Sequence, residues 1–221
     1  MTTINPHFTM NYAQPGEYNF SHDSVFLARL AFDYVKHNQT DVRHVLDLCS
    51  GCGVVGLDFL FHLKTNSTIL PSAIDFLEIQ SVYLPFFSTN CQTLERSINF
   101  KIPLNFLNLN YADVRNNLDF SQKYNLILCN PPFFRHGQGT LSPSDFKNRC
   151  RFFIDSDFKN LISSIGYLLA PGGKALVLIK ALKDHGVDIF KELETSTNGL
   201  AFQRINTLRG IEVFELTKPL V

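Results

Sequence analysis

Short apolar segments with the length of buried strands alternate along this chain with longer segments of helical periodicity. The expected strands span residues 44–49, 72–79, 104–109, 124–129, 174–179, 201–207 and 211–217, and the expected helices span 25–34, 54–63, 80–97, 158–169 and 188–195. Alternating strands and helices form parallel sheets that helices cover. The sequence therefore predicts an α/β fold with an open, doubly wound and mostly parallel sheet of about seven strands, which ends in an antiparallel hairpin.

Capping and breaking residues set the expected ends of two helices. Ser21 or Asp23 is expected to cap the first helix, because short polar side chains accept hydrogen bonds from free backbone amides there. The helix over 158–169 is expected to end at Ala170-Pro-Gly-Gly. No repeat or linker interrupts the 221 residues, so we expect one domain over 1–221, with an N-terminal arm and helix over 1–40 and a core over 41–221.

Charge and cysteine content limit the partners and the compartment. The 20 Lys and Arg residues balance 20 Asp and Glu residues, so any contact with nucleic acid must come from a local basic patch. The five cysteines are odd in number and lie among apolar or small residues, which is typical of free thiols in the cytoplasm. The sequence has neither a signal-peptide pattern nor an apolar run of about 18 residues, so we expect no export and no membrane span.

Polar and flexible residues follow the first three expected strands, at the edge where doubly wound sheets bind their ligands. Asp47 ends the first strand, and Gly51 and Gly53 in the next turn would let the backbone approach a ligand closely. Glu78 ends the second strand, and Asp113 follows the third. Carboxylates at this shared edge would accept hydrogen bonds from ribose hydroxyls, an amine or an ammonium group.

Two other kinds of site share these residues. Gly51-x-Gly53-x-x-Gly56 matches the dinucleotide fingerprint, which keeps a nicotinamide-dependent oxidoreductase open, although no proton donor is placed to suit hydride transfer. Cys49-x-x-Cys52 has the spacing of a redox site or half a zinc site, but no second Cys or Cys/His pair stands at ligand spacing. We therefore expect no metal ion.

The fourth expected strand ends in Asn130-Pro131-Pro132-Phe133-Phe134. Two consecutive prolines fix the backbone and lack amide donors, which would hold the Asn130 side-chain oxygen and the Pro131 carbonyl toward one point. Two such acceptors suit one planar amino group, whose conjugated nitrogen becomes a better nucleophile when its hydrogens are drawn toward acceptors. Phe133 or Phe134 would supply a ring on which a planar substrate stacks.

This motif resembles the Asn-Pro-Pro-Tyr/Phe motif of class I S-adenosylmethionine-dependent methyltransferases. The glycine turn after the first strand and the acidic residue after the second are similar to that family in order, and the resemblance covers nearly the whole chain. It implies a Rossmann-like methyltransferase fold, S-adenosyl-L-methionine as cofactor, and an amino group as methyl acceptor. It gives the catalytic role to Asn130, Pro131, Pro132 and Phe133.

Two further segments resemble the bacterial tRNA1(Val) adenine-N6 methyltransferase family. They are residues 134–143, with the spacing Gly-x-Gly-x-x-Ser-Pro, and the Phe-Ser-x-Asp run at 20–23. The likeness implies that the 20–23 run packs over the cofactor, that Glu78 holds the ribose hydroxyls, and that Asp113 lies near the adenine amine. The cofactor-binding residues expected on this basis are Phe20, Ser21, Asp23, Asp47, Gly51, Gly53, Glu78, Asp113 and Asn130.

The chain departs from that family at three places. Cys49 stands where the turn usually has its first glycine, and a cysteine fits there if its φ is negative. Phe133 replaces a tyrosine, which keeps the stacking face and loses a hydroxyl. Cys150-Arg-Phe-Phe replaces the usual Ala-Arg-His-Glu stretch. These departures bear on the substrate more than on the reaction.

Basic residues gather after the motif, as a site for RNA phosphates requires: Arg135, His136, Lys147, Arg149 and Arg151. The expected substrate-binding residues are Phe133, Phe134, Arg135, Arg149 and Arg151. We therefore expect a cytoplasmic, monomeric enzyme that methylates N6 of adenine in tRNA. The alternatives are a protein glutamine or ribosomal-RNA guanine N-methyltransferase, and a catalytically inactive methyltransferase-like scaffold that binds RNA or protein.

Overall fold

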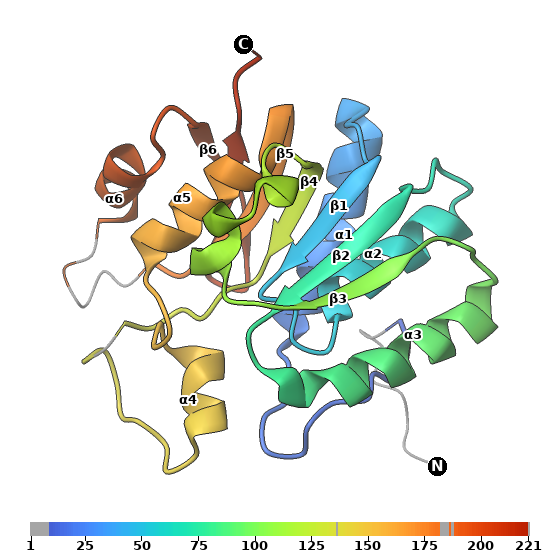
Figure 1. Cartoon of the computed structure of the whole chain (residues 1–221), viewed down its shortest axis with the longest axis horizontal. Helices are drawn as coiled ribbons and strands as arrows, with labels where there is room; N and C mark the ends of the chain where they lie inside the picture. Colours follow the sequence, from blue (N-terminus) through green and yellow to red (C-terminus); the bar gives the residue numbers. More distant parts are fainter. Residues whose placement is uncertain (1–8, 136, 182–185, 187, 221) are drawn as a thin grey trace.

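The computed structural model describes residues 9–135, 137–181, 186 and 188–220. Its helices are α1 (His22–Asn38), α2 (Val54–Thr65), α3 (Leu84–Ile98), α4 (Asp145–Arg151), α5 (Phe158–Leu168) and α6 (Ile189–Ser196), with short 3-10 helices η1 (Ser81–Tyr83), η2 (Tyr111–Asn116) and η3 (Leu118–Phe120). Its strands are β1 (His44–Leu48), β2 (Ala73–Glu78), β3 (Leu104–Asn108), β4 (Tyr124–Cys129), β5 (Leu169–Ile179), β6 (Ala201–Leu208) and β7 (Ile211–Thr217). Strands and helices alternate as the sequence predicts (Figure 1).

The seven strands form one sheet in the order β3-β2-β1-β4-β5-β7-β6. The first five strands in that order are parallel, and β7 is antiparallel to both β5 and β6. The fold class expected from the sequence is confirmed, including the antiparallel pair at the end. The chain order switches direction between β1 and β4, which is the place where doubly wound sheets open a crevice.

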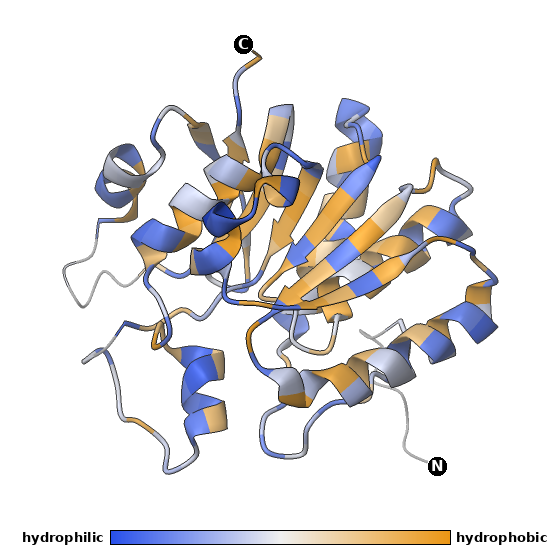
Figure 2. Ribbon diagram, viewed as in Figure 1, coloured by the Kyte–Doolittle hydropathy of each residue, from blue (hydrophilic) through white to orange (hydrophobic). Residues whose placement is uncertain are grey.

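Helices cover both faces of the sheet, and the sheet divides the core into two layers. The strands alternate their side chains between the layers, so that on β4 Leu126 and Leu128 belong to the layer of α1, α2 and α3, whereas Ile127 and Cys129 belong to the layer of α5 and α6. Apolar residues are concentrated along the strands in Figure 2. Among the described helices, none combines the length and the apolar character that crossing a membrane would need.

Two boundaries differ from the sequence-based expectation. The helix expected from residue 80 starts later, because η1 precedes α3 and Pro85 then occupies the first turn of α3. The segment Ala170-Pro-Gly-Gly was expected to end α5, but it belongs to β5. It extends the sheet because Gly172 N donates to Lys218 O and Lys218 N donates to Gly173 O, both at 3.0 Å.

The first helix is longer than the expected span 25–34, and Ser21 is its N-cap residue. The side chain of Ser21 caps no backbone amide, because its hydroxyl donates instead to Asp23 Oδ2 at 2.8 Å. Helix α4 was not expected. It has only 7 residues, too few to show a periodic pattern, and the Ser144 side chain caps it by accepting from Lys147 N.

Close packing brings α2 onto the sheet at Gly56. A Cβ atom added to Gly56 would lie 2.6 Å from Phe76 Cε1 and 3.1 Å from Asp47 Cβ, both on the sheet below. The Gly56 amide donates to Asp47 Oδ2 at 2.8 Å. The missing side chain therefore lets the amino end of α2 sit directly above the end of β1.

We predict that Gly56→Ala destabilises the fold. Forcing a methyl group into this contact costs about 1–3 kcal/mol, which exceeds the roughly 1 kcal/mol that alanine contributes to a helix. The urea midpoint should fall. Gly16→Ala is the control, because nothing lies within 4 Å of a Cβ atom added there. An unchanged midpoint for Gly56→Ala would contradict the close approach.

Candidate functional site

A cavity of about 210 Å³ opens at the carboxyl ends of the strands, beside the switch between β1 and β4. Six segments contribute to its walls: the N-terminal arm, the turn after β1, the residues after β2, the residues after β3, the motif after β4, and the segment around α4. The residues that line it include Phe20, Ser21, Ser24, Cys49, Ser50, Gly51, Glu78, Gln80, Tyr83, Asn110, Tyr111, Asn130, Pro131, Pro132, Phe133, Phe134, Arg149, Cys150, Arg151 and Ser156. Figure 1 shows α4 below the carboxyl ends of the strands, apart from the helices that cover the sheet.

The turn after β1 has a strongly curved backbone. Cys49, Gly51 and Gly53 have φ values of 61°, 53° and 84°, all in the left-handed region. Gly51 lines the cavity, and its amide donates to Glu78 Oε2 at 2.9 Å. Gly53 instead serves as the N-cap residue of α2, outside the cavity wall. The turn is thus attached on one side to β2 and on the other to α2.

Glu78 is the buried carboxylate of the cavity wall. Its two oxygens accept from Gly51 N and from Gln80 N, each at 2.9 Å. Burial raises its pKa to about 7, although these backbone hydrogen bonds pull the pKa down. A carboxylate oxygen can accept more than one hydrogen bond, so Glu78 retains acceptor capacity toward the cavity.

Asp47 supports the turn from below and does not line the cavity. It is fully buried, and one carboxylate oxygen accepts from Gly56 N at 2.8 Å. The other oxygen has no partner within the described residues. Burial, helped by the nearby Glu78 carboxylate, raises the pKa of Asp47 to about 7, although the hydrogen bond from the Gly56 amide pulls the pKa down.

Asn130 stands on the cavity wall directly after β4. Its side-chain Nδ2 donates to Ser24 Oγ at 2.9 Å, so the first turn of α1 holds the amide. The two prolines that follow offer no amide hydrogen, and the next two amides, of Phe133 and Phe134, both donate to Arg151 O at 3.1 and 2.9 Å. The motif is therefore fixed at its start by α1 and at its end by the residue that closes α4.

Helix α4 contacts the segment after β2 through two side chains. The Phe146 ring packs on the Tyr83 ring with centroids 5.4 Å apart, and Cys150 Sγ lies 3.2 Å from Tyr83 Oη. Gln80 Nε2 donates to the same sulfur at 3.5 Å. Burial raises the pKa of the Cys150 thiol, which keeps it protonated at neutral pH.

The N-terminal arm is held over the cavity by polar contacts. Asn90 is buried on α3, where its amide accepts from Ala13 N at 2.7 Å and donates to both Ala13 O and Cys52 O at 3.0 Å. Further along the arm, Glu17 accepts from Ser144 Oγ at 2.8 Å. The arm therefore connects the glycine turn on one side with the start of α4 on the other.

The donors and acceptors left in this cavity suit a polar ligand. The hydroxyls of Ser50 and Ser156 line it and are buried without a partner in the described part of the chain. Glu78 has acceptor capacity at the end of β2, and Gly51 presents backbone without a side chain. A nucleoside with an attached amino acid, which offers ribose hydroxyls and charged groups, fits these residues.

A family model described as the methyltransferase small domain matches residues 19–143, more than half of the chain. The chain belongs to the methyltransferase small domain family. The methyl donor of this family is S-adenosylmethionine, and the predicted cofactor is confirmed. No curated protein matches the sequence.

Solved structures share the fold at low sequence identity. A candidate methyltransferase of Escherichia coli, yhhF, has a TM-score of 0.58 at 14% identity, over 94% of this chain and 92% of its own. A candidate RNA methyltransferase of Pyrococcus horikoshii has a TM-score of 0.58 at 12% identity, over 96% of this chain and 94% of its own. The T. thermophilus 16S rRNA N2 G1207 methyltransferase RsmC was solved in complex with AdoMet and guanosine. It has a TM-score of 0.55 at 19% identity, over 92% of this chain but 44% of its own. These likenesses confirm the Rossmann-like methyltransferase fold.

Several expected cofactor residues of this methyltransferase small domain do line the cavity: Phe20, Ser21, Gly51, Glu78 and Asn130. Asp23, Asp47 and Gly53 do not line it. Asp113 was expected to bind the cofactor, but it is exposed on η2 and does not line the cavity. Asn110 caps η2, accepting from Ala112 N, and it and Tyr111 face the cavity in its place.

The expected substrate residues separate into two groups. Phe133, Phe134, Arg149 and Arg151 line the cavity, whereas Arg135 does not. The Arg135 guanidinium forms a bidentate ion pair with the carboxylate of Glu192 on α6. Lys147 is not part of the cavity wall. His136 lies outside the described residues.

Sequence reasoning missed two polar contacts of the wall, Ser24 with Asn130 and Tyr83 with Cys150. Ser24 is separated from Asn130 by 106 positions, and Tyr83 from Cys150 by 67. Ser24 does interrupt an apolar helix pattern with a small polar residue, but that signal names no partner. Such contacts depend on how the helices pack.

Cys49 differs from expectation, because its φ is 61° and not negative. A residue with a Cβ atom is disfavoured there, and a β-branched residue is disfavoured most.

We predict that Cys49→Gly raises the free energy of unfolding by about 1 kcal/mol and preserves S-adenosylmethionine binding. Cys49→Val should lower both stability and affinity, measured by urea unfolding and calorimetry. Equal behaviour of the two variants would contradict the strained turn.

We predict that cofactor affinity depends on the protonation of Glu78. Its folded pKa of about 7 exceeds the ordinary 4.5, so the carboxylate ionises only as the pH rises through about 7. The ionised form accepts hydroxyl hydrogen bonds more strongly, so affinity should rise over that range. Folding stability should fall as the pH rises from about 4.5 to about 7, because the unfolded chain releases this proton at lower pH than the folded chain does.

The measurement is a series of binding titrations across that pH range, with wild type and Glu78→Gln compared so that titration of the cofactor itself cancels. The variant should bind more weakly and with a flatter pH dependence. The remaining slope belongs to Asp47, which has a similar pKa. Identical slopes for the two proteins would show that Glu78 does not set the pH dependence.

Proposed function

We propose that this chain transfers the methyl group of S-adenosylmethionine to an exocyclic amine of a nucleobase in RNA, with N6 of adenine in tRNA as the leading case. The observation that carries the proposal is the position of Asn130. It stands on the wall of the cavity that also contains Glu78 and Gly51, and its amide is held by Ser24. The Pro-Pro-Phe that follows lines the same cavity.

The residues of the motif would bind and orient the amine. With Nδ2 engaged by Ser24, the Asn130 Oδ1 is the atom left to accept from an amino group, and the Pro131 carbonyl would accept its second hydrogen. Drawing both hydrogens toward acceptors raises electron density on the nitrogen. The bound cofactor supplies an electrophilic methyl group on a sulfonium. The rate gain of such a site comes mainly from position, because the reactants are held in line.

A planar base as the methyl acceptor is supported by the aromatic residues beside the motif. Phe133 and Phe134 both line the cavity and are only partly buried. Phe133 is the better stacking ring, because Arg151, Lys180 and Phe152 already lie against the ring of Phe134. Stacking of one base on an aromatic side chain contributes about 1–3 kcal/mol in proteins that bind single strands. RNA as the substrate is supported by the RNA methyltransferases among the structural neighbours.

A ribosomal-RNA guanine is the second candidate acceptor, because the neighbour from T. thermophilus is an rRNA N2 methyltransferase that was solved with guanosine. The test is transfer from labelled S-adenosylmethionine into unmodified tRNA and rRNA, followed by mass analysis of nucleosides. N6-methyladenosine in tRNA supports the leading case, and N2-methylguanosine in rRNA supports the second. Label in neither RNA overturns both.

We predict that Asn130→Ala lowers the rate of methyl transfer by about 10²–10³-fold, the usual effect of removing one positioned hydrogen-bonding group. S-adenosylmethionine affinity should change little, because Glu78 and the glycine turn remain. Asn125→Ala is the matched control on the other end of β4, where Asn125 bonds to Asp41 and His44. Single-turnover assays and binding titrations measure the two effects. Full activity in Asn130→Ala would remove the proposed role of the motif.

A further inference from the structure

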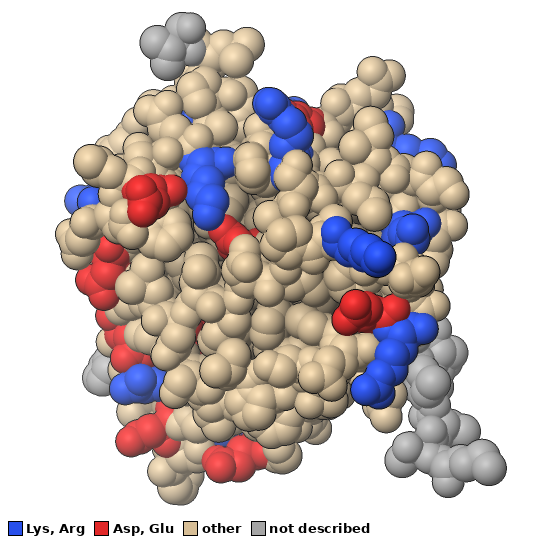
Figure 3. Space-filling view, turned by 45° about the vertical axis from the view of Figure 1, so that its right-hand side comes forward, with Lys and Arg blue, Asp and Glu red and all other residues tan. Residues whose placement is uncertain are grey.

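The basic residues near the motif differ in whether a carboxylate neutralises them. Arg135 is paired with Glu192, and Arg149 lies 3.3 Å from Asp155. Arg151 and Lys180 have no carboxylate partner among the residues that the structure describes. On the face shown in Figure 3, both signs of charge are interspersed without a broad basic area. Local pairing therefore decides which cations can meet an anion.

Arg151 and Lys180 converge on one aromatic ring. The Arg151 guanidinium carbon lies 5.7 Å from the centroid of the Phe134 ring, and Lys180 Nζ lies 4.9 Å from it. Arg151 also lies over the Phe152 ring, at 5.3 Å. Both cations are partly buried. Ring contacts of this kind contribute about 0.5–1 kcal/mol each, so they hold the side chains in place without cancelling the positive charge.

The two cations come from different elements that meet beside the motif. Arg151 ends α4, and its carbonyl accepts the amides of Phe133 and Phe134. Lys180 follows β5, whose Val177 is in register with Cys129 at the end of β4. Both positions are therefore set by backbone pairing with the segment that carries Asn130. A charge fixed there lies next to the place where the acceptor amine would bind.

We propose that Arg151 and Lys180 bind the phosphodiester backbone of the RNA strand beside the nucleotide that is methylated. This inference rests on the proposed function. A guanidinium binds a phosphate through two parallel hydrogen bonds, and an ammonium binds it as a point charge. Contacts to phosphates fix the register of a strand without reading its sequence. The pair would thus hold the strand while Phe133 stacks on the base and Asn130 accepts from the amine.

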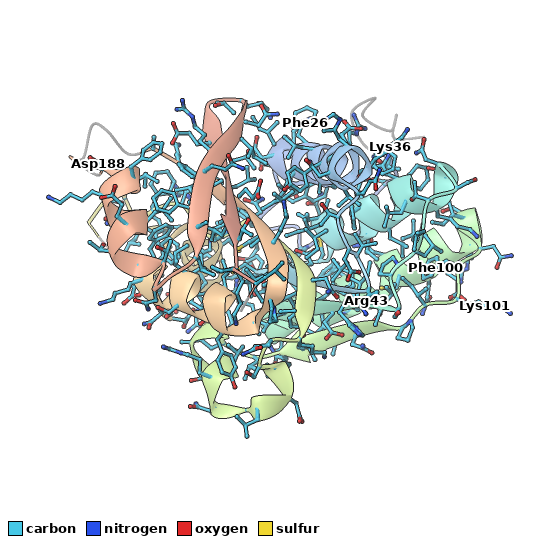
Figure 4. The ribbon with its side chains drawn as sticks, turned by 90° about the horizontal axis from the view of Figure 1, so that it is seen from above. Phe26, Lys36, Arg43, Phe100, Lys101 and Asp188 are labelled. Carbon is cyan, nitrogen blue, oxygen red and sulfur yellow. The ribbon has the colours of Figure 1, made fainter. Side chains whose placement is uncertain are left out.

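The test compares wild type with Lys180→Gln and Arg151→Gln, using an unmodified tRNA transcript as the probe. Lys101→Gln is the matched control, since Lys101 is exposed and lies at the opposite end of the molecule from Asp188, the N-cap residue of α6 (Figure 4). Affinity is measured by fluorescence anisotropy over a series of salt concentrations. Methyl transfer is measured with the same transcript, and melting curves monitor folding.

We expect Lys180→Gln and Arg151→Gln each to reduce the slope of log affinity against log salt by about 0.7–0.9, the change for one lost phosphate contact. The KM for the transcript should rise about tenfold at physiological salt, whereas kcat and S-adenosylmethionine affinity stay close to wild type. Lys180→Arg should restore the slope, because it keeps the charge. Lys101→Gln should behave as wild type.

An unchanged salt slope in both variants, together with normal RNA methylation by the wild type, overturns this inference and leaves the proposed function standing. If the wild type methylates neither RNA, the proposed function fails and this inference fails with it. A lower melting temperature in Arg151→Gln would trace its effect to loss of the α4 contacts. Lys180→Gln then decides the matter, because Lys180 follows β5 and lies outside α4.

Discussion

The parallel pairing of β1 with β4 is the constraint on which the site depends. Its register places Leu48 opposite Cys129, so the glycine turn and Asn130 start from neighbouring points on one edge of the sheet. Because the chain visits β2 and β3 between these strands, the carboxyl end of β2 adds Glu78 at the same edge. A cavity with a carboxylate, a glycine turn and an amide thus follows from strand order.

The polar groups of this edge are held at an electrostatic cost. Asp47 and Glu78 are both buried, and burial raises the pKa of each to about 7. Backbone amides of Gly56, Gly51 and Gln80 offset part of that cost. Carboxylates that are desolvated and only partly compensated are typical of binding sites, where a ligand supplies the remaining hydrogen bonds. The fold therefore gives up some stability to keep these two carboxylates at the edge of the sheet.

The parts of the molecule that close the cavity are less regular than the sheet. The arm and α4 meet through Glu17 and Ser144, and Asn90 attaches the arm to the glycine turn. The segment that carries α4 returns to the motif at Arg151, whose carbonyl accepts hydrogen bonds from the amides of Phe133 and Phe134. The same return places Arg151 over Phe134 beside Lys180. Local geometry of the motif and the charge beside it therefore have one structural origin.

The sequence by itself determined the alternation of strands and helices, the final antiparallel pair and the order of the glycine turn, Glu78 and Asn130, because these features follow from periodicity and from residues within a few positions. Only the tertiary structure decided that Asp113 is exposed, that Cys49 has a positive φ, and which cations lack a partner. The contact of Ser24 with Asn130 joins elements 106 positions apart. Such contacts depend on how helices pack on the sheet, and a local pattern carries no information about a distant partner.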